Sequence, residues 1–284
     1  MQIDGRTEVI AHLGYPTHAF KAPLVYNPYF EAAGINAVVV PMACRAEHFP
    51  ALLPRLFELD NVRGALITMP HKVSVLALLD ELTPTARVAG ACNAVKRLPD
   101  GRLAGDQFDG AGFVRGLQRK GFATAGARTL VVGAGGVGSA IAASLAAAGA
   151  AQLALFDTNE ASVDALAQRL RTVFPQVGVV TGQRDPAGFD LVVNATPLGM
   201  QPGDPLPVDV ARIAPGAFVG EVVMRTEKTA FLRAAEARGC RIQVGTDMLF
   251  EMIPPYLEFF GYPTTTAERL RELARLPVTT EEIA

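Results

Sequence analysis

Short apolar runs alternate along the chain with segments whose apolar residues recur at helical spacing. Strands are predicted at residues 9–13, 36–42, 64–69, 129–132, 153–156, 177–180, 190–195, 217–223 and 240–244. Helices are predicted at residues 73–79, 108–121 and 248–261, and a hairpin at residues 96–105 around a Pro-Asp-Gly turn. The alternation of the two patterns indicates an α/β fold with mainly parallel strands, in two domains that divide near residues 105–125.

The composition is that of a soluble globular protein. Half of the 284 residues are hydrophobic, 19% are charged, and the formal net charge of −2 gives no reason to expect nucleic acid as a partner. No apolar run is long enough to span a bilayer, and the first residues lack the layout of a signal peptide. Three widely spaced cysteines favour reduced thiols, so we expect a cytoplasmic protein. The four histidines lack metal-ligand spacing, so we expect no metal.

A glycine loop is the strongest local signal. In residues 129–150 a β-branched strand leads into the loop and an alanine-rich helix follows. Gly133 permits the tight turn, Gly135 lets the backbone approach a pyrophosphate, and Gly138 lets the helix pack closely on the strand. The helix N-terminus then offers free N–H groups to phosphates. We predict a dinucleotide site at Gly133, Ala134, Gly135, Gly136, Val137 and Gly138. The alternative is a tight turn without a ligand.

The end of the next predicted strand indicates which dinucleotide binds. Asp157 is at the expected distance to accept a hydrogen bond from a ribose 2′-hydroxyl, and its charge would repel a 2′-phosphate. No arginine follows at once, since the sequence continues Thr158-Asn159-Glu160. We therefore predict that NAD is preferred, with NADP possible. Asp157 as a solvent-exposed carboxylate at a strand end is the alternative.

The stretch DLVVNATPLGM at residues 190–200 is another strand that runs into a polar loop. Loops at the carboxyl ends of parallel strands line the ligand crevice. Asn194 and Thr196 are therefore candidate cofactor residues, although both are also common in turns.

These motifs, in this order, resemble the shikimate/quinate dehydrogenase family over nearly the whole chain. The matching segments are Gly14, Pro16, Pro23 and Asn27, then TMPHK at 68–72, GACNAV at 90–95, GDQFDGAGF at 105–113, GAGGVG at 133–138, NATPLGM at 194–200 and GTDML at 245–249. The resemblance implies a substrate-binding domain at residues 1–107 and 246–284 and a Rossmann-like NAD(P)-binding domain at residues 108–245. It also implies that the C-terminal helix returns to the first domain.

The resemblance assigns roles to particular residues. Lys72, an unexpected charge between an apolar strand and an apolar helix face, matches the catalytic lysine, and Asp109 matches its partner aspartate. A lysine can serve as acid and base for a secondary alcohol if partial burial lowers its pKa, whereas the aspartate opposes that shift. Asn93 and Thr68 match substrate-binding positions. Further cofactor positions implied by the resemblance are Met200, Val222 and Gly245.

The sequence departs from the family pattern at the substrate. Phe20 and Ala22 stand where two serines normally hold the substrate carboxylate, and Leu66 replaces an asparagine. Met252 replaces a glutamine, and Met224 stands where a tyrosine is expected. Since the proposed acid/base pair remains, the sequence indicates an oxidoreductase for a cyclic hydroxy acid or polyol with altered preference. Lys21 and Arg225 are candidate replacement cations for the carboxylate.

Two other functions stay open from the sequence alone, a redox-sensing NAD-binding module without catalysis and a folate-type two-domain dehydrogenase. We expect a small-molecule substrate, neither nucleic acid nor membrane as a partner, and a monomer or homodimer.

Overall fold

The computed structural model describes residues 2–18 and 20–276, and its contacts divide the chain into two units. Unit 1 comprises Met1–Ala86, Ala91–Phe108 and Ile253–Ala284, and unit 2 comprises Arg87–Gly90 and Asp109–Met252. The domain boundaries implied by the family resemblance stay a prediction.

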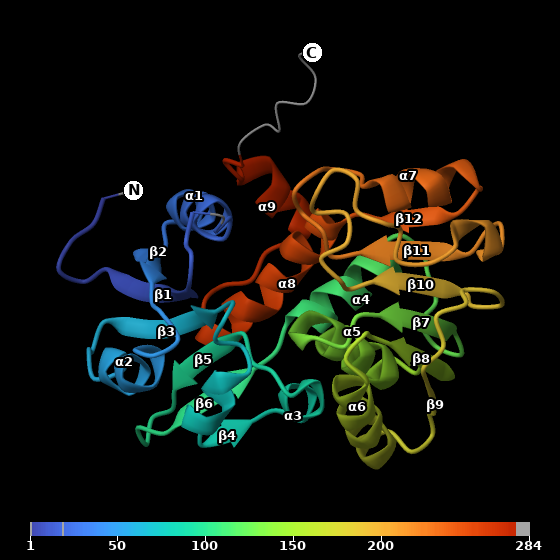
Figure 1. Cartoon of the computed structure of the whole chain (residues 1–284). Helices are drawn as coiled ribbons and strands as arrows, with labels where there is room; N and C mark the ends of the chain where they lie inside the picture. The colour runs from blue at the N-terminus through green and yellow to red at the C-terminus, as the bar shows by residue number, and fades with distance from the viewer. Residues whose placement is uncertain (1, 19, 277–284) are drawn as a thin grey trace. The chain divides into compact units, whose positions relative to one another are not determined.

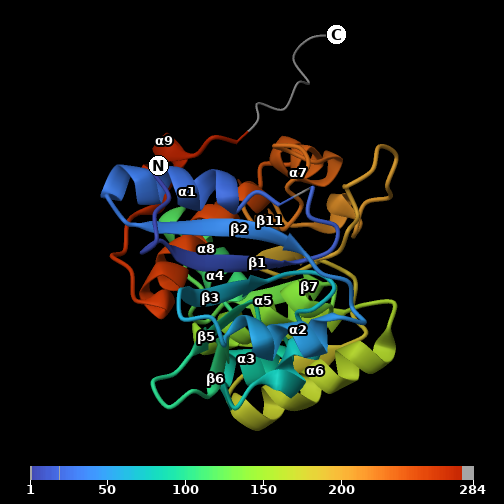
Figure 2. The same cartoon turned by 90° about the vertical axis from the view of Figure 1, so that its left-hand side faces the viewer.

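Unit 1 is built on a six-stranded sheet with the order β2-β1-β3-β5-β6-β4. Its strands are β1 Glu8–Gly14, β2 Ala37–Ala43, β3 Val62–Ile67, β4 Glu81–Leu82, β5 Ala94–Arg97 and β6 Leu103–Asp106. Strand β1 pairs in parallel with β2 and β3, whereas β5 is antiparallel to both β3 and β6. Figure 2 shows β2, β1 and β3 side by side, with α1 running along β2. The sheet is therefore mixed, and the predicted hairpin at residues 96–105 forms from β5 and β6.

The helices of unit 1 are α1 Pro23–Ala33, α2 Phe49–Leu56, the 3-10 helix η1 Ser74–Leu78 and α9 Ala267–Leu273. Helices α3 Pro84–Ala89 and α8 Gly245–Phe260 contain residues of both units. The two sides of β1 differ because successive side chains alternate across a strand. Ala11 and Leu13 pack into a core with Phe49 and Leu53 of α2. His12 therefore lies on the opposite face of the sheet.

The predicted helix at residues 73–79 forms over nearly the same residues, but as the 3-10 helix η1 rather than as an α-helix. The chain is extended at Leu79, where the backbone has φ −110° and ψ 138°. The backbone N–H of Asp80 then donates to the Leu103 carbonyl (2.9 Å), and the next two residues pair with β6. Sheet pairing thus ends the helix before a second turn can form.

Unit 2 has a fully parallel six-stranded sheet with the order β12-β11-β10-β7-β8-β9, which Figure 1 shows from top to bottom. Its strands are β7 Arg128–Val132, β8 Gln152–Phe156, β9 Gly178–Thr181, β10 Leu191–Asn194, β11 Phe218–Glu221 and β12 Arg241–Gln243. Its helices are α4 Asp109–Arg119, α5 Gly136–Ala147, α6 Glu160–Val173, η2 Val210–Arg212 and α7 Ala230–Ala237. This is the doubly wound order of a Rossmann fold, in which ligands bind where the strand order reverses, here between β7 and β10.

Successive side chains of the central strands of unit 2 point to opposite faces of the sheet and join two different hydrophobic cores. Val131 of β7 and Val193 of β10 join one apolar cluster with α5, whereas Leu130 and Val192 join another with α7. Strands covered on both faces read as continuous apolar runs, which is why the sequence predicted them well.

Candidate functional site

The glycine loop lies between β7 and α5 and has the backbone geometry that its sequence requires. Gly133 has φ 109°, and a Cβ placed on it would lie 2.7 Å from the carbonyl oxygen of Ala195. A Cβ on Gly138 would overlap the Gly133 carbonyl oxygen, so the helix can start here only without a side chain. A Cβ on Gly135 would meet nothing within 4 Å. The protein's own packing therefore does not require Gly135, whereas close approach of a ligand would.

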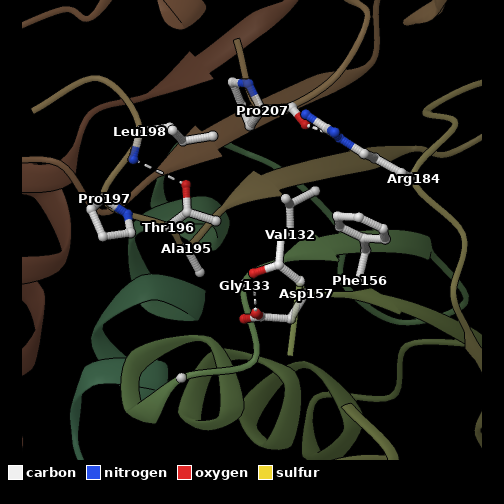
Figure 3. A pocket seen from close by; sticks show the side chains of 12 residues that line it. Val132, Gly133, Phe156, Asp157, Arg184, Ala195, Thr196, Pro197, Leu198 and Pro207 are labelled. Atoms are coloured by element: carbon white, nitrogen blue, oxygen red, sulfur yellow. Dashed lines mark hydrogen bonds between the residues drawn. The ribbon is translucent and has the colours of Figure 1, made fainter. Parts of the chain in front are cut away.

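A cavity of about 340 Å³ opens beside this loop (Figure 3). Its size is within the usual range for a small-molecule site. Gly133, Gly135, Asp157 and Thr196, all predicted from the sequence, line it. The other lining residues are Val132, Phe156, Thr158, Arg184, Ala195, Pro197, Leu198 and Pro207.

The carboxylate of Asp157 is held at the end of β8 by the backbone. The Ala134 N–H donates to its Oδ2 (2.7 Å) and the Asn159 N–H donates to its Oδ1 (2.9 Å). Burial alone would raise the pKa of Asp157, but these bonds to the charged form outweigh burial and lower it. The pocket therefore presents an ionised carboxylate that is fixed to the glycine loop.

The loop after β10 is organised by its own side chains. Asn194 is fully buried, its Nδ2 donates to the Leu198 carbonyl (2.9 Å), and its Oδ1 accepts a hydrogen bond from Thr196 Oγ1 (2.6 Å). Thr196 Oγ1 in turn accepts from the Leu198 N–H (3.1 Å), as Figure 3 shows. In this structure Asn194 shapes the loop, and Thr196 reaches the pocket wall.

The remaining predicted cofactor residues lie around this edge of the sheet. Met200 is 37% exposed, and the Val222 N–H donates to the Asn194 carbonyl (3.2 Å). Gly245 begins α8, where a Cβ would overlap the Val223 carbonyl oxygen. The fully buried Glu221 at the end of β11 accepts a hydrogen bond from Thr229 (2.8 Å). Burial raises the pKa of Glu221 to about 7, and its hydrogen bond joins the end of β11 to the N-cap of α7.

Sequence reasoning missed Arg184. Its Nε donates to the Pro207 carbonyl (2.8 Å), and its guanidinium carbon lies 5.4 Å from the centre of the Phe156 ring. Figure 3 shows the guanidinium on the opposite side of Phe156 from Asp157. No local motif marks Arg184, because three loops from distant parts of the chain have to meet before its position is defined.

In unit 1, Lys72 lies in the turn between β3 and η1. Its side chain is half-buried, and its carbonyl accepts a hydrogen bond from the Cys92 N–H (2.8 Å). The neighbouring His71 is buried, stacks on Phe49 with ring centres 3.9 Å apart, and hydrogen-bonds through Nε2 to the Cys44 carbonyl (2.8 Å). His71 thus fixes the turn that presents Lys72. Asp109 is buried in the first turn of α4, in unit 2.

Asn93 is almost fully buried, and most of its polar atoms have partners. Its carbonyl accepts from the Ile67 N–H (2.8 Å) and the Tyr256 hydroxyl (3.3 Å), and its Oδ1 accepts from the Phe108 N–H (2.9 Å). Its buried Nδ2 has no hydrogen-bond partner among the described residues. An unpaired buried donor costs about 1–3 kcal/mol, so this amide is suited to donate to a substrate oxygen.

The residues that replace the family's polar ligands are largely buried. Ala22 is 8% exposed, Leu66 is 5% exposed, and Phe20 is half-buried. A Cβ placed on Gly14 would overlap Thr68 Cγ2 and lie 2.8 Å from Phe20 Cζ, so the Phe20 ring tip reaches the end of β1. Met252 belongs to unit 2, where its Cβ packs against Gly112.

The two candidate replacement cations differ in their surroundings. Lys21 is half-buried, and burial lowers the pKa of its ammonium group. Arg225 is exposed and donates to Gln201 Oε1 (3.2 Å) in unit 2.

Comparisons with known proteins identify the family. Residues 13–95 match the sequence profile of the shikimate dehydrogenase substrate binding domain, and residues 119–178 match that of the ThiF family. Shikimate dehydrogenase (NADP(+)) of Rubrobacter xylanophilus is 38% identical over 255 residues, covering 87% of this chain and 88% of the relative. The chain belongs to the shikimate dehydrogenase family.

Solved structures of the family have the same fold. Shikimate 5-dehydrogenase from Listeria monocytogenes, in complex with shikimate and NAD, has a TM-score of 0.89 at 25% identity and covers 96% of this chain and 98% of its own. Quinate dehydrogenase from Corynebacterium glutamicum, in complex with NAD, has a TM-score of 0.84 at 30% identity, with coverage of 94% and 98%. The 5-ketofructose reductase of Gluconobacter sp. has a TM-score of 0.87 at 25% identity, with coverage of 95% and 98%.

These findings confirm the resemblance and the predicted fold class. As a member of the shikimate dehydrogenase family, the chain is an NAD(P)-dependent oxidoreductase of the shikimate/quinate class, and a nicotinamide dinucleotide is its cofactor. The redox-sensing module and the folate-type dehydrogenase are therefore set aside. Within residues 2–18 and 20–276, no helix is both long and apolar enough to cross a bilayer.

Proposed function

We propose that this member of the shikimate dehydrogenase family prefers NAD to NADP and acts on a cyclic hydroxy compound other than shikimate. The observation that carries the proposal is that Phe20, Ala22 and Leu66, all apolar and at least half-buried, stand where the family pattern has polar ligands. A small-molecule substrate, a monomer or homodimer, and a cytoplasmic location stay predictions.

A nicotinamide dinucleotide bound at the glycine loop would supply the hydride acceptor for oxidation and the hydride donor for reduction. Lys72 takes the hydroxyl proton at Nζ during oxidation and returns it to the forming alkoxide during reduction. Asp109 is its proposed partner. Asn93 Nδ2, which has no partner among the described residues, donates to a substrate hydroxyl oxygen and orients the ring. Thr68, beside Gly14 at the end of β3, is a further substrate contact.

The preference for NAD is supported by the charges in the cofactor pocket. The fixed carboxylate of Asp157 suits a ribose 2′-hydroxyl and repels a 2′-phosphate. Arg184 is the cation of the pocket lining, and its guanidinium is already engaged with the carbonyls of Pro207 (2.8 Å) and Leu206 (3.4 Å). The Rubrobacter relative is an NADP(+) enzyme, so the preference is a departure that has to be measured.

Replacing Asp157 with serine is expected to narrow the preference for NAD. The serine keeps a hydroxyl for the ribose but removes the negative charge, so kcat/KM with NADP should rise relative to NAD by about 10-fold or more, the scale of one charge interaction of about 1.4 kcal/mol. Steady-state kinetics with both cofactors measures this. As a control, exposed Asp209 at the start of η2 can be changed to serine, which keeps an oxygen at that cap. A wild type that prefers NADP would contradict the assignment of Asp157.

The altered substrate preference follows from the cost of burying a carboxylate. Each hydrogen bond to a charged group contributes about 1.5–3 kcal/mol, so losing two weakens carboxylate binding by roughly 10²–10⁴-fold. The Gluconobacter neighbour is a reductase of 5-ketofructose, a compound without a carboxylate. A protein with this fold thus acts on an uncharged substrate, which supports a preference of this chain for a substrate without a carboxylate.

The wild-type enzyme tests this proposal when shikimate is compared with its carboxamide. The two compounds have the same ring and nearly the same shape, but only shikimate carries the negative charge. We expect a higher kcat/KM for the carboxamide, followed by absorbance of the reduced cofactor. Efficient oxidation of shikimate together with rejection of the carboxamide would contradict the proposal.

A further inference from the structure

His12 is a buried polar side chain of β1, on the face of the sheet that also bears Leu66. It is 8% exposed, and its register partner on β3 is Leu66. Side chains that are paired in register project from the same face of a sheet, so His12 and Leu66 are neighbours. The family pattern that identified Phe20, Ala22 and Leu66 did not draw attention to His12, which sits inside an apolar strand.

The imidazole of His12 is held by an aromatic stack. Its ring centre lies 4.0 Å from that of Phe20, with 27° between the ring planes. The tip of Phe20 also reaches Gly14, next to Thr68. Phe20 and Leu66 therefore both lie beside the His12 ring, and Phe20 restricts its orientation.

One ring nitrogen of His12 makes no hydrogen bond to the described residues. Nδ1 is buried and has no hydrogen-bond partner among the described residues. A proton on Nδ1 would be a buried donor without an acceptor, so the neutral ring carries its proton on Nε2. Nε2 is at the tip of the ring, away from the backbone of β1, and from there it can donate to a ligand.

The ring is also uncharged under ordinary conditions. Burial, and then the positive charge of Lys72, lower the pKa of His12 to about 4. Lys72, whose charge contributes to this lowering, is the proposed acid/base group. Both burial and Lys72 thus oppose protonation of His12, so the ring is not suited to neutralise the carboxylate of a charged substrate.

We propose that His12 is a specificity-determining substrate ligand that donates a hydrogen bond from Nε2 to an uncharged oxygen of the substrate, a hydroxyl, carbonyl or amide oxygen. Phe20 positions the ring by stacking. This inference rests on the proposed function, because it places the substrate beside Lys72 and Asn93. It goes further by naming the group that replaces the lost polar ligands and the chemistry that this group selects.

Three substitutions separate the hydrogen bond from the packing. His12→Phe keeps an aromatic ring against Phe20 but removes the donor. His12→Gln places an amide nitrogen near the position of Nε2, whereas His12→Asn reaches only as far as Nδ1. The control is His48→Phe, at an exposed histidine before α2 whose side chain makes no capping hydrogen bond. All four variants and the wild type are assayed with NAD and the carboxamide of shikimate.

We expect His12→Phe and His12→Asn to lower kcat/KM for the carboxamide by about 10-fold, mainly through KM, as the loss of one hydrogen bond predicts. His12→Gln should stay within about 3-fold of the wild type, and His48→Phe should match it. The dissociation constant of NAD and the thermal unfolding midpoint should be unchanged in the Phe and Gln variants, which excludes a merely structural role.

The outcomes separate this inference from the proposed function. A wild type that uses the carboxamide and a His12→Phe variant that equals it would overturn the role of His12 alone. A loss confined to kcat, or an equal loss in His12→Gln, would also overturn it. A wild type that prefers shikimate to the carboxamide contradicts the proposed function before any variant is made. If His12→Phe then impairs shikimate oxidation, the ring contacts a charged group and selection for an uncharged oxygen is wrong.

Discussion

Lys72→Ala is expected to lower turnover by about 10²–10⁴-fold, the usual contribution of a positioned acid or base, while NAD binding survives. The fold should tolerate the change, because Lys72 contributes its carbonyl to the hydrogen bond with Cys92 and the neighbouring turn is anchored by buried His71. The glycine loop and Asp157 lie in unit 2, so their geometry does not depend on this side chain. Steady-state turnover with the better of shikimate and its carboxamide gives the rate, and NAD titration gives the affinity.

A matched control is Lys228→Ala. Lys228 pairs with Glu236 at 2.9 Å on the surface of unit 2, and exposed ion pairs contribute little to stability. Its removal should change neither turnover nor NAD affinity. A Lys72→Ala enzyme with near-wild-type turnover would show that the lysine is structural, and the acid/base group would have to be sought elsewhere. Loss of NAD affinity together with turnover would indicate a folding defect instead.

The sequence predicted the parts of this molecule that local rules determine. Gly138 is required by a contact only five residues away, with the Gly133 carbonyl, and the buried strands of unit 2 appear as apolar runs because both faces are covered. The helix at residues 73–79 forms as a 3-10 helix and not as an α-helix, and the chain after it pairs with β6, which lies much later in the sequence. The helix propensity of a short segment does not include hydrogen bonds to residues far away in the sequence.

The sites that the sequence did not predict depend on register and on loops meeting in space. His12 is one histidine in an apolar strand until the pairing of β1 with β3 puts it beside Leu66 and the following loop brings Phe20 onto its ring. Arg184 becomes a pocket residue only when its loop meets Phe156 and Pro207. Asn93 was recognised by its motif, but its unpaired Nδ2 becomes visible only once all of its other partners are placed.

The double variant Phe20→Ser/Ala22→Ser is expected to raise kcat/KM for shikimate, by as much as the roughly 10²–10⁴-fold that two charge-assisted hydrogen bonds can supply. The two hydroxyls would restore donors where the chain now offers an aromatic ring and a methyl group. The full gain is not expected, because removing the Phe20 ring leaves a void beside Gly14 and ends the stack on His12. Thermal unfolding has to be followed alongside the kinetics.

Phe20→Ala is the matched control, since it opens the same void without adding a hydroxyl. The informative quantity is the ratio of kcat/KM for shikimate to that for its carboxamide. Charge-assisted hydrogen bonds are roughly twice as strong as neutral ones, so the serines should raise this ratio, whereas the void alone should leave it unchanged. A ratio that rises equally in Phe20→Ala would mean that the ring excludes the carboxylate by its bulk.

The ratio of kcat/KM for shikimate to that for its carboxamide in the wild type decides how the result for the double variant is interpreted. If the wild type already oxidises shikimate efficiently, some other group must hold the carboxylate, and Lys21 is the strongest candidate. It lies between the two altered positions, and its half-buried ammonium, whose pKa burial lowers, would gain from a carboxylate neighbour. Lys21→Met would then abolish shikimate oxidation while sparing the carboxamide. If instead the wild type favours the carboxamide and a stably folded double variant gains nothing on shikimate, Phe20 and Ala22 do not face the substrate carboxylate. Both side chains would then serve packing rather than substrate specificity.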